Sequence, residues 1–169
     1  QTCALPIFHA VQSEYSLWSR RVEDGVLGYC GDNGIALVAY SPVGRGFLAG
    51  GVRDMARLSE RDIRHGMPRF QGDAFRRNLS VLEQVEILGI GWGMTLAQVC
   101  LNWLWSRGEH VGAIPGTSDL SHWRDDQGAT VPLSDEQVGQ LESLLNAYQF
   151  EGERYAPDKL AQLDSERSK

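Results

Sequence analysis

In residues 35–51, which read IALVAYSPVGRGFLAGG, an apolar run is followed by groups that can bind a ligand. The run closes on an aromatic ring and a hydroxyl group, Tyr40 and Ser41, and a segment with four glycines and one arginine, Arg45, follows. Glycines let backbone amides approach an anion closely, and an arginine adds charge-assisted hydrogen bonds. The segment therefore indicates an anion site at the end of a buried strand, although a surface turn would also explain a lone Gly-Arg-Gly.

Other residues with reactive side chains do not form a recognisable constellation. The acidic residues Asp125, Asp126 and Glu136 suggest a metal site at first, but an adjacent pair on one helix does not supply ligand geometry. His65 and His110 have no nucleophile in a recognisable relation to them. Neither a metal site nor a catalytic base is predicted from this pattern.

The composition restricts the class of protein. A chain of 169 residues with 42% hydrophobic residues can bury one ordinary core, so it is one globular domain or a piece of a larger one. A net charge of −6 argues against nucleic acids and anionic membranes as partners. Cys3, Cys30 and Cys100 have no paired spacing, which favours a reducing cytoplasm. The longest apolar runs are well short of the roughly twenty residues of a membrane helix.

The first residues, QTCALPIF, call for a separate interpretation. They are apolar, but they lack the basic start and the cleavage pattern of an export signal. The run ALPI matches the translation of a widely used sequencing adapter. Residues 1–8 are therefore expected to be non-native, and the biological chain is expected to enter in mid-gene.

The order of elements indicates a parallel α/β fold. The segments with the character of strands are residues 8–17, 35–41 and 110–116. Helical spacing is present in residues 22–33, 74–88, 95–107 and 134–148. Thr95 and Ser134 are expected to cap the last two helices, and the apolar second strand is typical of a strand covered on both faces. Three parallel strands fit either a small doubly wound domain or part of an eight-stranded barrel of about 250 residues.

Two further segments are expected to pack weakly. Residues 43–73 are rich in glycine and charged side chains, so we expect them to be loop-like rather than packed. Long loops of this kind are usually functional or disordered. The polar tail from Gly152 is expected to be loosely held.

Four motifs, in this order and at this spacing, resemble the aldo-keto reductase family: VQSEYSLWSRRVEDGVL, GIALVAYSPVGRGFLAG, TLAQVCLNW and IPGTSDLSHWRDDQGA. PRFQGDAFRRN with a late GERY is similar to the bacterial and plant branch that resembles the auxin-induced reductases. The resemblance implies that residues 9–151 are the C-terminal half of a (β/α)8 TIM barrel, an α/β fold with parallel strands and outer helices. Residues 152–169 would follow as a polar tail. It also implies an NADP(H) cofactor and a small-molecule carbonyl substrate.

The same resemblance assigns cofactor contacts to residues near three strand ends. Gln12 matches the glutamine that holds the nicotinamide carboxamide, and Tyr40 matches the residue whose ring stacks on nicotinamide. The segment along the pyrophosphate is matched by Ser41, Pro42, Val43, Gly44, Arg45 and Gly46. The matches near the adenosine 2′-phosphate and the adenine ring are Gly116, Thr117, Ser118, His122, Asp125 and Asp126. Arg69 could reach a cofactor phosphate, whereas Glu14 and Tyr15 are expected to give structural support.

One position departs from the pattern of the branch. Many relatives have Lys and Arg where this chain has Ser118 and Asp119, and an acidic side chain beside a dianionic phosphate is unfavourable. The resemblance therefore leaves the choice between NADPH and NADH open.

The family's catalytic acid, a tyrosine supported by a lysine, an aspartate and a histidine, belongs to the first half of the barrel. We therefore expect no catalytic residue here, and we expect this chain alone to be inactive. The leading hypothesis is the cofactor-binding C-terminal portion of an NADP(H)-dependent reductase that converts aldehydes or ketones to alcohols. Two alternatives stay open: a non-catalytic NADP(H)-binding regulatory subunit of the same fold, and a different TIM-barrel enzyme such as a lyase.

Overall fold

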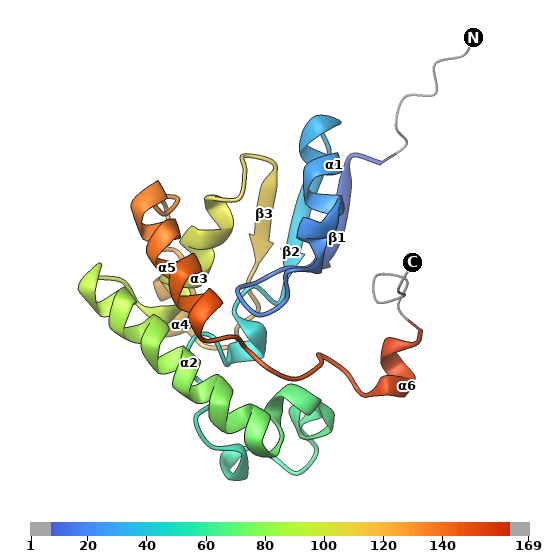
Figure 1. Cartoon of the computed structure of the whole chain (residues 1–169), viewed down its shortest axis with the longest axis vertical. Coiled ribbons are helices and arrows are strands. Elements are labelled where there is room, and N and C mark those ends of the chain that lie inside the picture. The colour runs from blue at the N-terminus through green and yellow to red at the C-terminus, as the bar shows by residue number, and fades with distance from the viewer. Residues whose placement is uncertain (1–7, 163–169) are drawn as a thin grey trace.

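A computed structural model describes residues 8–162, so the predicted non-native segment lies, except for Phe8, outside the described residues. Three parallel strands form one sheet in the order β1-β2-β3. They are Ala10–Glu14, Ala36–Tyr40 and Val111–Ile114, and each lies within a segment predicted to be a strand. In Figure 1 the three strands lie side by side.

Helices cover one face of this sheet, directly or through other helices, and only the last one, α6, lies away from it (Figure 1). The helices are α1 (Val26–Asp32), α2 (Gly72–Gly91), α3 (Leu96–Trp105), α4 (Leu120–Asp126), α5 (Asp135–Ala147) and α6 (Pro157–Leu160). In Figure 1, α1 lies next to β1 and β2, and α2, α3 and α5 lie beyond β3. α1 packs on β2 and α3 packs on β3, while α6 stands apart from the other helices (Figure 1). Within residues 8–162 no single helix is long and apolar enough to cross a membrane; α2 and α3 reach that length and composition only jointly, with a bend of 83° between them.

Alternating burial along β2 identifies the covered face. Leu37 and Ala39 have no exposed surface, whereas Val38 and Tyr40 are half-buried. Successive side chains of a strand point to opposite faces, so the helices cover the Leu37 face and leave the Tyr40 face open. The prediction that this strand is covered on both faces is therefore wrong for the described residues, because the helices that contact the sheet, α1 and α3, lie against the face of Leu37 and Ala39.

Local sequence signals place most helix ends correctly. Thr95 and Ser134 each accept a hydrogen bond from the backbone three residues on, and the glutamine at that position bonds back to the cap, so both are capping boxes. The predicted helix over residues 22–33 is instead broken at Gly25. A 3-10 helix, Arg21–Asp24, precedes the break and α1 follows it.

The long connection between β2 and α2 is irregular but packed. Its 3-10 helices are Gly44–Gly46, Met55–Arg57, Ile63–Gly66 and Pro68–Phe70. Phe47 and Leu48 are fully buried, and Phe47 and Phe70 form an aromatic cluster with Trp18. The expectation of a loop without packing is wrong, because apolar side chains spaced irregularly along this region still reach the core.

Residues 150–155, which we call the C-terminal strap, are also held in place. The fully buried Asn78 donates to the carbonyl oxygens of Arg69 and Glu151, each at 2.9 Å, and accepts from the Glu151 amide at 2.7 Å. The Arg69 amide donates to the carbonyl oxygen of Glu153 at 3.3 Å. The prediction of a loosely held tail from Gly152 is therefore wrong for residues 152–155, because distant partners satisfy the backbone of the strap.

Candidate functional site

Strand register brings the three predicted cofactor segments to one edge of the sheet. Tyr40, the last residue of β2, pairs with Glu14 of β1 and Ile114 of β3. The turns that follow β2 and β3 therefore start side by side. Gln12 pairs with Val38, two residues before Tyr40, so the exposed Gln12 and the half-buried Tyr40 share the open face. Ligands of parallel α/β proteins bind at this carboxyl edge.

The turn after β2 has a tight, left-handed backbone. Ser41 and Arg45 have φ values of 52° and 56°, which non-glycine residues rarely adopt, and the Gly44 amide donates to the Ser41 carbonyl oxygen at 2.9 Å. Gly44 itself has φ 56°, and a Cβ there would lie 2.8 Å from Cγ of Leu48. Strained backbone of this kind clusters at ligand sites. Pro42 and Val43 are buried, so these two residues pack the turn against the rest of the protein.

Two arginines gather at this turn. Arg64 donates from Nη1 to the carbonyl oxygen of Arg45 at 2.9 Å and is fixed by a 2.7 Å ion pair with Asp62. Arg45 donates to the hydroxyl of Tyr155 in the C-terminal strap, at 2.9 Å. Burial raises the pKa of the Tyr40 hydroxyl, and the nearby Arg154 opposes that rise. Arg45, Arg64 and Arg154 therefore all lie near the carboxyl end of β2, with the carboxylates of Asp62 and Glu14 beside them.

The turn after β3 is open and carries a negative charge instead. Gly116, Thr117 and Ser118 are exposed, and the Thr117 hydroxyl accepts from the Asp119 amide at 3.0 Å. The Asp119 carboxylate caps α4 by accepting from the Ser121 amide and hydroxyl at 2.7 and 2.5 Å. These hydrogen bonds hold the pKa of Asp119 below its usual range, so the carboxylate stays charged at neutral pH.

The three predicted residues on α4 differ in their contacts. Asp125 accepts from the hydroxyl of Thr95 at 2.8 Å and from Gln98 at 3.0 Å, so it fastens α4 to the start of α3, a role that sequence reasoning did not predict. Burial and the neighbouring Asp125 raise the pKa of Asp126, and His122 opposes this shift. His122 is exposed on the first turn of the helix.

A cluster of charged side chains that was not predicted lies beside the β1 end. Glu14 is buried and accepts from the Ser19 hydroxyl at 2.6 Å, from Arg69 at 3.4 Å and from Arg154 at 3.3 Å. The sequence offers no signal for this cluster, because the arginines stand 55 and 140 residues from Glu14. Arg69 is buried next to Glu14 and stacked on Trp18, and its contact with a cofactor phosphate stays a prediction.

Tyr15 belongs to a separate network that joins the sheet to the helices. Its hydroxyl donates to Glu23 at 2.7 Å and accepts from Arg107 at 3.2 Å, and its ring packs against Trp103. Burial, followed by the hydrogen bond to Glu23, raises the pKa of Tyr15 above its ordinary value. The side chain is fully buried, which confirms its predicted structural role. Among residues 8–162 no group of three or more His, Cys, Asp or Glu side chains could hold a metal ion.

Comparison with known proteins identifies the family. A profile of the Aldo/keto reductase family matches residues 4–146. The chain belongs to this family. Among solved structures, the glycerol dehydrogenase from Gluconobacter oxydans superimposes with a TM-score of 0.77 at 21% identity, over 88% of this chain and 45% of that one. A thermostable aldo-keto reductase solved with the inhibitor epalrestat gives a TM-score of 0.52 at 30% identity, over 80% of this chain and 39% of that one.

This aldo/keto reductase chain thus spans less than half the length of both solved structures. Their likeness confirms the predicted fold class, because the parallel strands and outer helices form part of the barrel fold of the family. Family membership excludes the alternative of an unrelated barrel enzyme such as a lyase. The placement in the auxin-induced-like branch stays a prediction.

Proposed function

We propose that this chain is the cofactor-binding portion of an NADP(H)-dependent oxidoreductase that reduces aldehydes or ketones to alcohols by hydride transfer. The observation that carries the proposal is the register of the sheet, which sets Gln12, Tyr40 and the turns after β2 and β3 along one edge. A dinucleotide is an extended ligand, so residues that hold its two ends must stand on neighbouring strands.

The residues at the β2 end fit the nicotinamide half of such a cofactor. The half-buried ring of Tyr40 offers an aromatic face on the open side of the sheet, and Gln12 offers a donor and an acceptor on the same side. The glycine-rich turn, with Arg45 and Arg64 beside it, suits a pyrophosphate. When bound, the nicotinamide supplies or accepts the hydride, and these side chains orient it.

The residues at the β3 end fit the 2′-phosphate of NADPH less well. The charged Asp119 stands at this turn, and residues 115–121 contain no Lys or Arg. A 2′-phosphate would lie close to that carboxylate and repel it. We therefore propose that this protein binds NADPH with only a weak preference over NADH.

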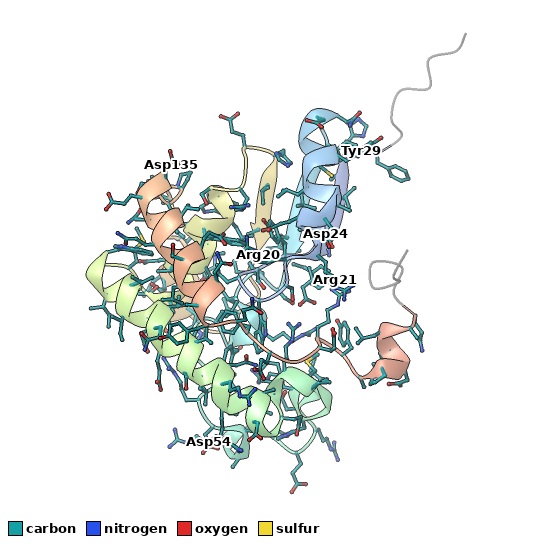
Figure 2. All side chains as sticks on the ribbon, in the orientation of Figure 1. Arg20, Arg21, Asp24, Tyr29, Asp54 and Asp135 are labelled. Atoms are coloured by element: carbon teal, nitrogen blue, oxygen red, sulfur yellow. The ribbon has the colours of Figure 1, made fainter. Side chains whose placement is uncertain are left out.

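A fluorescence titration of the gene product with NADPH and NADH tests the cofactor assignment. Tyr40→Ala should weaken binding of both by about 1–2 kcal/mol, or roughly 5- to 30-fold, because it removes a stacked ring. The matched control is Tyr29→Ala, since Tyr29 is 63% exposed on α1 and lies away from the carboxyl ends of the strands (Figure 2). Equal affinities for the two variants would remove Tyr40 from the site.

The same titration tests the turn after β3. Ser118→Lys should raise the preference for NADPH over NADH, because it adds a cation where the 2′-phosphate would lie. An unchanged ratio would mean that this turn does not hold the phosphate.

Activity assays distinguish the enzyme from the regulatory alternative. With NADPH and a panel of aldehydes, the gene product should consume the cofactor, whereas the 169-residue chain alone should show no turnover, since a positioned acid contributes roughly 10²–10⁴ in rate. Tight NADPH binding by a gene product that reduces no carbonyl compound would instead support a regulatory subunit.

A further inference from the structure

The C-terminal strap reaches the turn after β2 through the side chain of Tyr155. The strap leads from α5 to α6 past the carboxyl ends of the strands (Figure 1). The Tyr155 hydroxyl accepts a hydrogen bond from Nη2 of Arg45 at 2.9 Å, although the two residues stand 110 positions apart. We propose that Tyr155 is a positioning residue, which holds the Arg45 guanidinium ready to bind the pyrophosphate of the cofactor. This inference rests on the proposed function.

The backbone of Arg45 is fixed before any ligand binds. Its φ of 56° lies in the left-handed region, which non-glycine residues rarely adopt. Its carbonyl oxygen accepts from Nη1 of Arg64 at 2.9 Å. Arg64 is held in turn by Asp62, to which it donates from Nε at 2.8 Å and from Nη2 at 2.7 Å. The point from which the Arg45 side chain leaves the turn is therefore fixed, and only its own torsion angles remain to be restrained.

Tyr155 restrains this flexible side chain. Besides the hydrogen bond, Cζ of Arg45 lies 5.8 Å from the centroid of the Tyr155 ring. The ring is half-buried against the hydrophobic core, and Cζ of Arg154 lies 5.4 Å from its centroid. An arginine has many rotamers, so a contact that orders it in the free protein reduces the entropy lost when a ligand binds.

The hydrogen bond to Tyr155 leaves Arg45 suited to an anion. Within residues 8–162 the Arg45 side chain donates to Tyr155 only and forms no ion pair, whereas the neighbouring Arg64 is paired with Asp62 at 2.7 Å. A hydroxyl acceptor orients a guanidinium but, unlike a carboxylate, does not neutralise its charge. A guanidinium has five N–H donors, so most of those of Arg45 stay available for phosphate oxygens.

The contact lies beside the residue assigned to the nicotinamide. Burial is the main cause of the raised pKa of the Tyr40 hydroxyl, and Tyr155 and Arg45 also act on it, so both lie near this group. Binding free energies are reciprocal, so a residue of the strap that aids cofactor binding is itself stabilised by the cofactor. The inference therefore predicts that cofactor binding tightens the strap.

Fluorescence titration of the gene product with NADPH tests the role of Tyr155. Tyr155→Phe keeps the ring and removes the hydroxyl, so NADPH should bind about threefold to tenfold more weakly, the effect of ordering one rotamer-rich side chain on binding. The matched control Tyr148→Phe should change nothing, because Tyr148 is 57% exposed and its hydroxyl has no hydrogen-bond partner within residues 8–162. Equal affinities of Tyr155→Phe and the wild type overturn the proposal.

A double-mutant cycle separates positioning from a general structural effect. Arg45→Met should weaken NADPH binding about tenfold or more, because it removes charge-assisted hydrogen bonds to the pyrophosphate. In the Arg45→Met background, Tyr155→Phe should have no further effect. An equal loss in both backgrounds would mean that Tyr155 supports the fold rather than Arg45, and it would contradict the proposal, as would unchanged binding by Arg45→Met.

ADP-ribose, which has the pyrophosphate but no nicotinamide, distinguishes this inference from the proposed function. In calorimetric titrations its binding should weaken in Tyr155→Phe by the same factor as that of NADPH and stay constant in Tyr40→Ala. If Tyr40→Ala weakens NADPH binding while Tyr155→Phe changes neither ligand, the proposed function stands and this inference fails. If ADP-ribose binding depends on Tyr155 in a gene product without turnover, this inference stands and the reductase activity fails. A wild type that binds neither ligand refutes both.

Hydrogen exchange of the wild type covers the case in which Tyr155→Phe does not fold. NADPH should slow the exchange of strap amides, such as that of Glu151, which donates to Oδ1 of Asn78 at 2.7 Å. The slowing should be larger in the strap than in α5, because only the strap contacts Arg45. Strap amides that exchange at an unchanged or higher rate, or that slow no more than those of α5, contradict the proposal.

Discussion

Replacing Gly152 by alanine should detach the C-terminal strap and destabilise the protein. Gly152 has φ 84°, and an added Cβ would lie 2.6 Å from Cα and 2.8 Å from the backbone nitrogen of Arg69. An alanine in the left-handed region costs roughly 1–2 kcal/mol. The backbone must also move, which weakens the bond between the Arg69 amide and the Glu153 carbonyl oxygen by about 1 kcal/mol. The free energy of unfolding should therefore fall by about 2–3 kcal/mol.

Gly139 provides the matched control for this substitution. It lies on the exposed side of α5, and a Cβ there would meet nothing within 4 Å. Gly139→Ala should stabilise the protein by roughly 0.5–1 kcal/mol, because alanine favours the helix. Both free energies are obtained from urea unfolding followed by circular dichroism. If Gly152→Ala were as stable as wild type while Gly139→Ala gained stability as expected, the strap would not be packed as described.

Two further predictions concern the sheet and a buried tyrosine. Within residues 8–162, β1 and β3 each pair along one edge only, and Ile114 is 47% exposed on the open face, so the 169-residue chain expressed alone should self-associate. A monomer in size-exclusion chromatography with a sharp cooperative melt would contradict this. Because the pKa of Tyr15 is raised in the folded state, its contribution to stability is complete below the ordinary pKa near 10 and is lost as the pH rises above it. Urea midpoints between pH 8 and 11 should fall less steeply for Tyr15→Phe than for wild type, and parallel curves would refute this role.

Features that depend on residues close in sequence were predicted well. The strand at Ala36–Tyr40 follows from a run of apolar and β-branched side chains, and the starts of α3 and α5 follow from Thr95 and Ser134. A capping box involves residues three positions apart, so it can be recognised without knowing the rest of the fold. The break at Gly25 was missed because helical spacing continues across it.

The family motifs located the cofactor segments but did not reveal what their side chains contact. Gln12 and Tyr40 do share one face of the sheet, as the assignment requires. Asp125, in contrast, bonds to Thr95 and Gln98, about 30 positions earlier. A motif fixes the position of a residue in the chain, whereas the direction of its hydrogen bonds depends on the helix packed beside it.

The sequence by itself determined the order of parallel strands and helices, the N-caps of α3 and α5, the family membership and the presence of a glycine-rich turn after β2. Each of these rests on local spacing or on a motif. Only the tertiary structure decided that Arg69 and Arg154 meet at Glu14 and that residues 150–155 strap this cluster in place. The physical reason is that these contacts join segments 55 to 140 residues apart. Their geometry is fixed by strand register and by the burial of Asn78, and neither leaves a periodic signal in the chain.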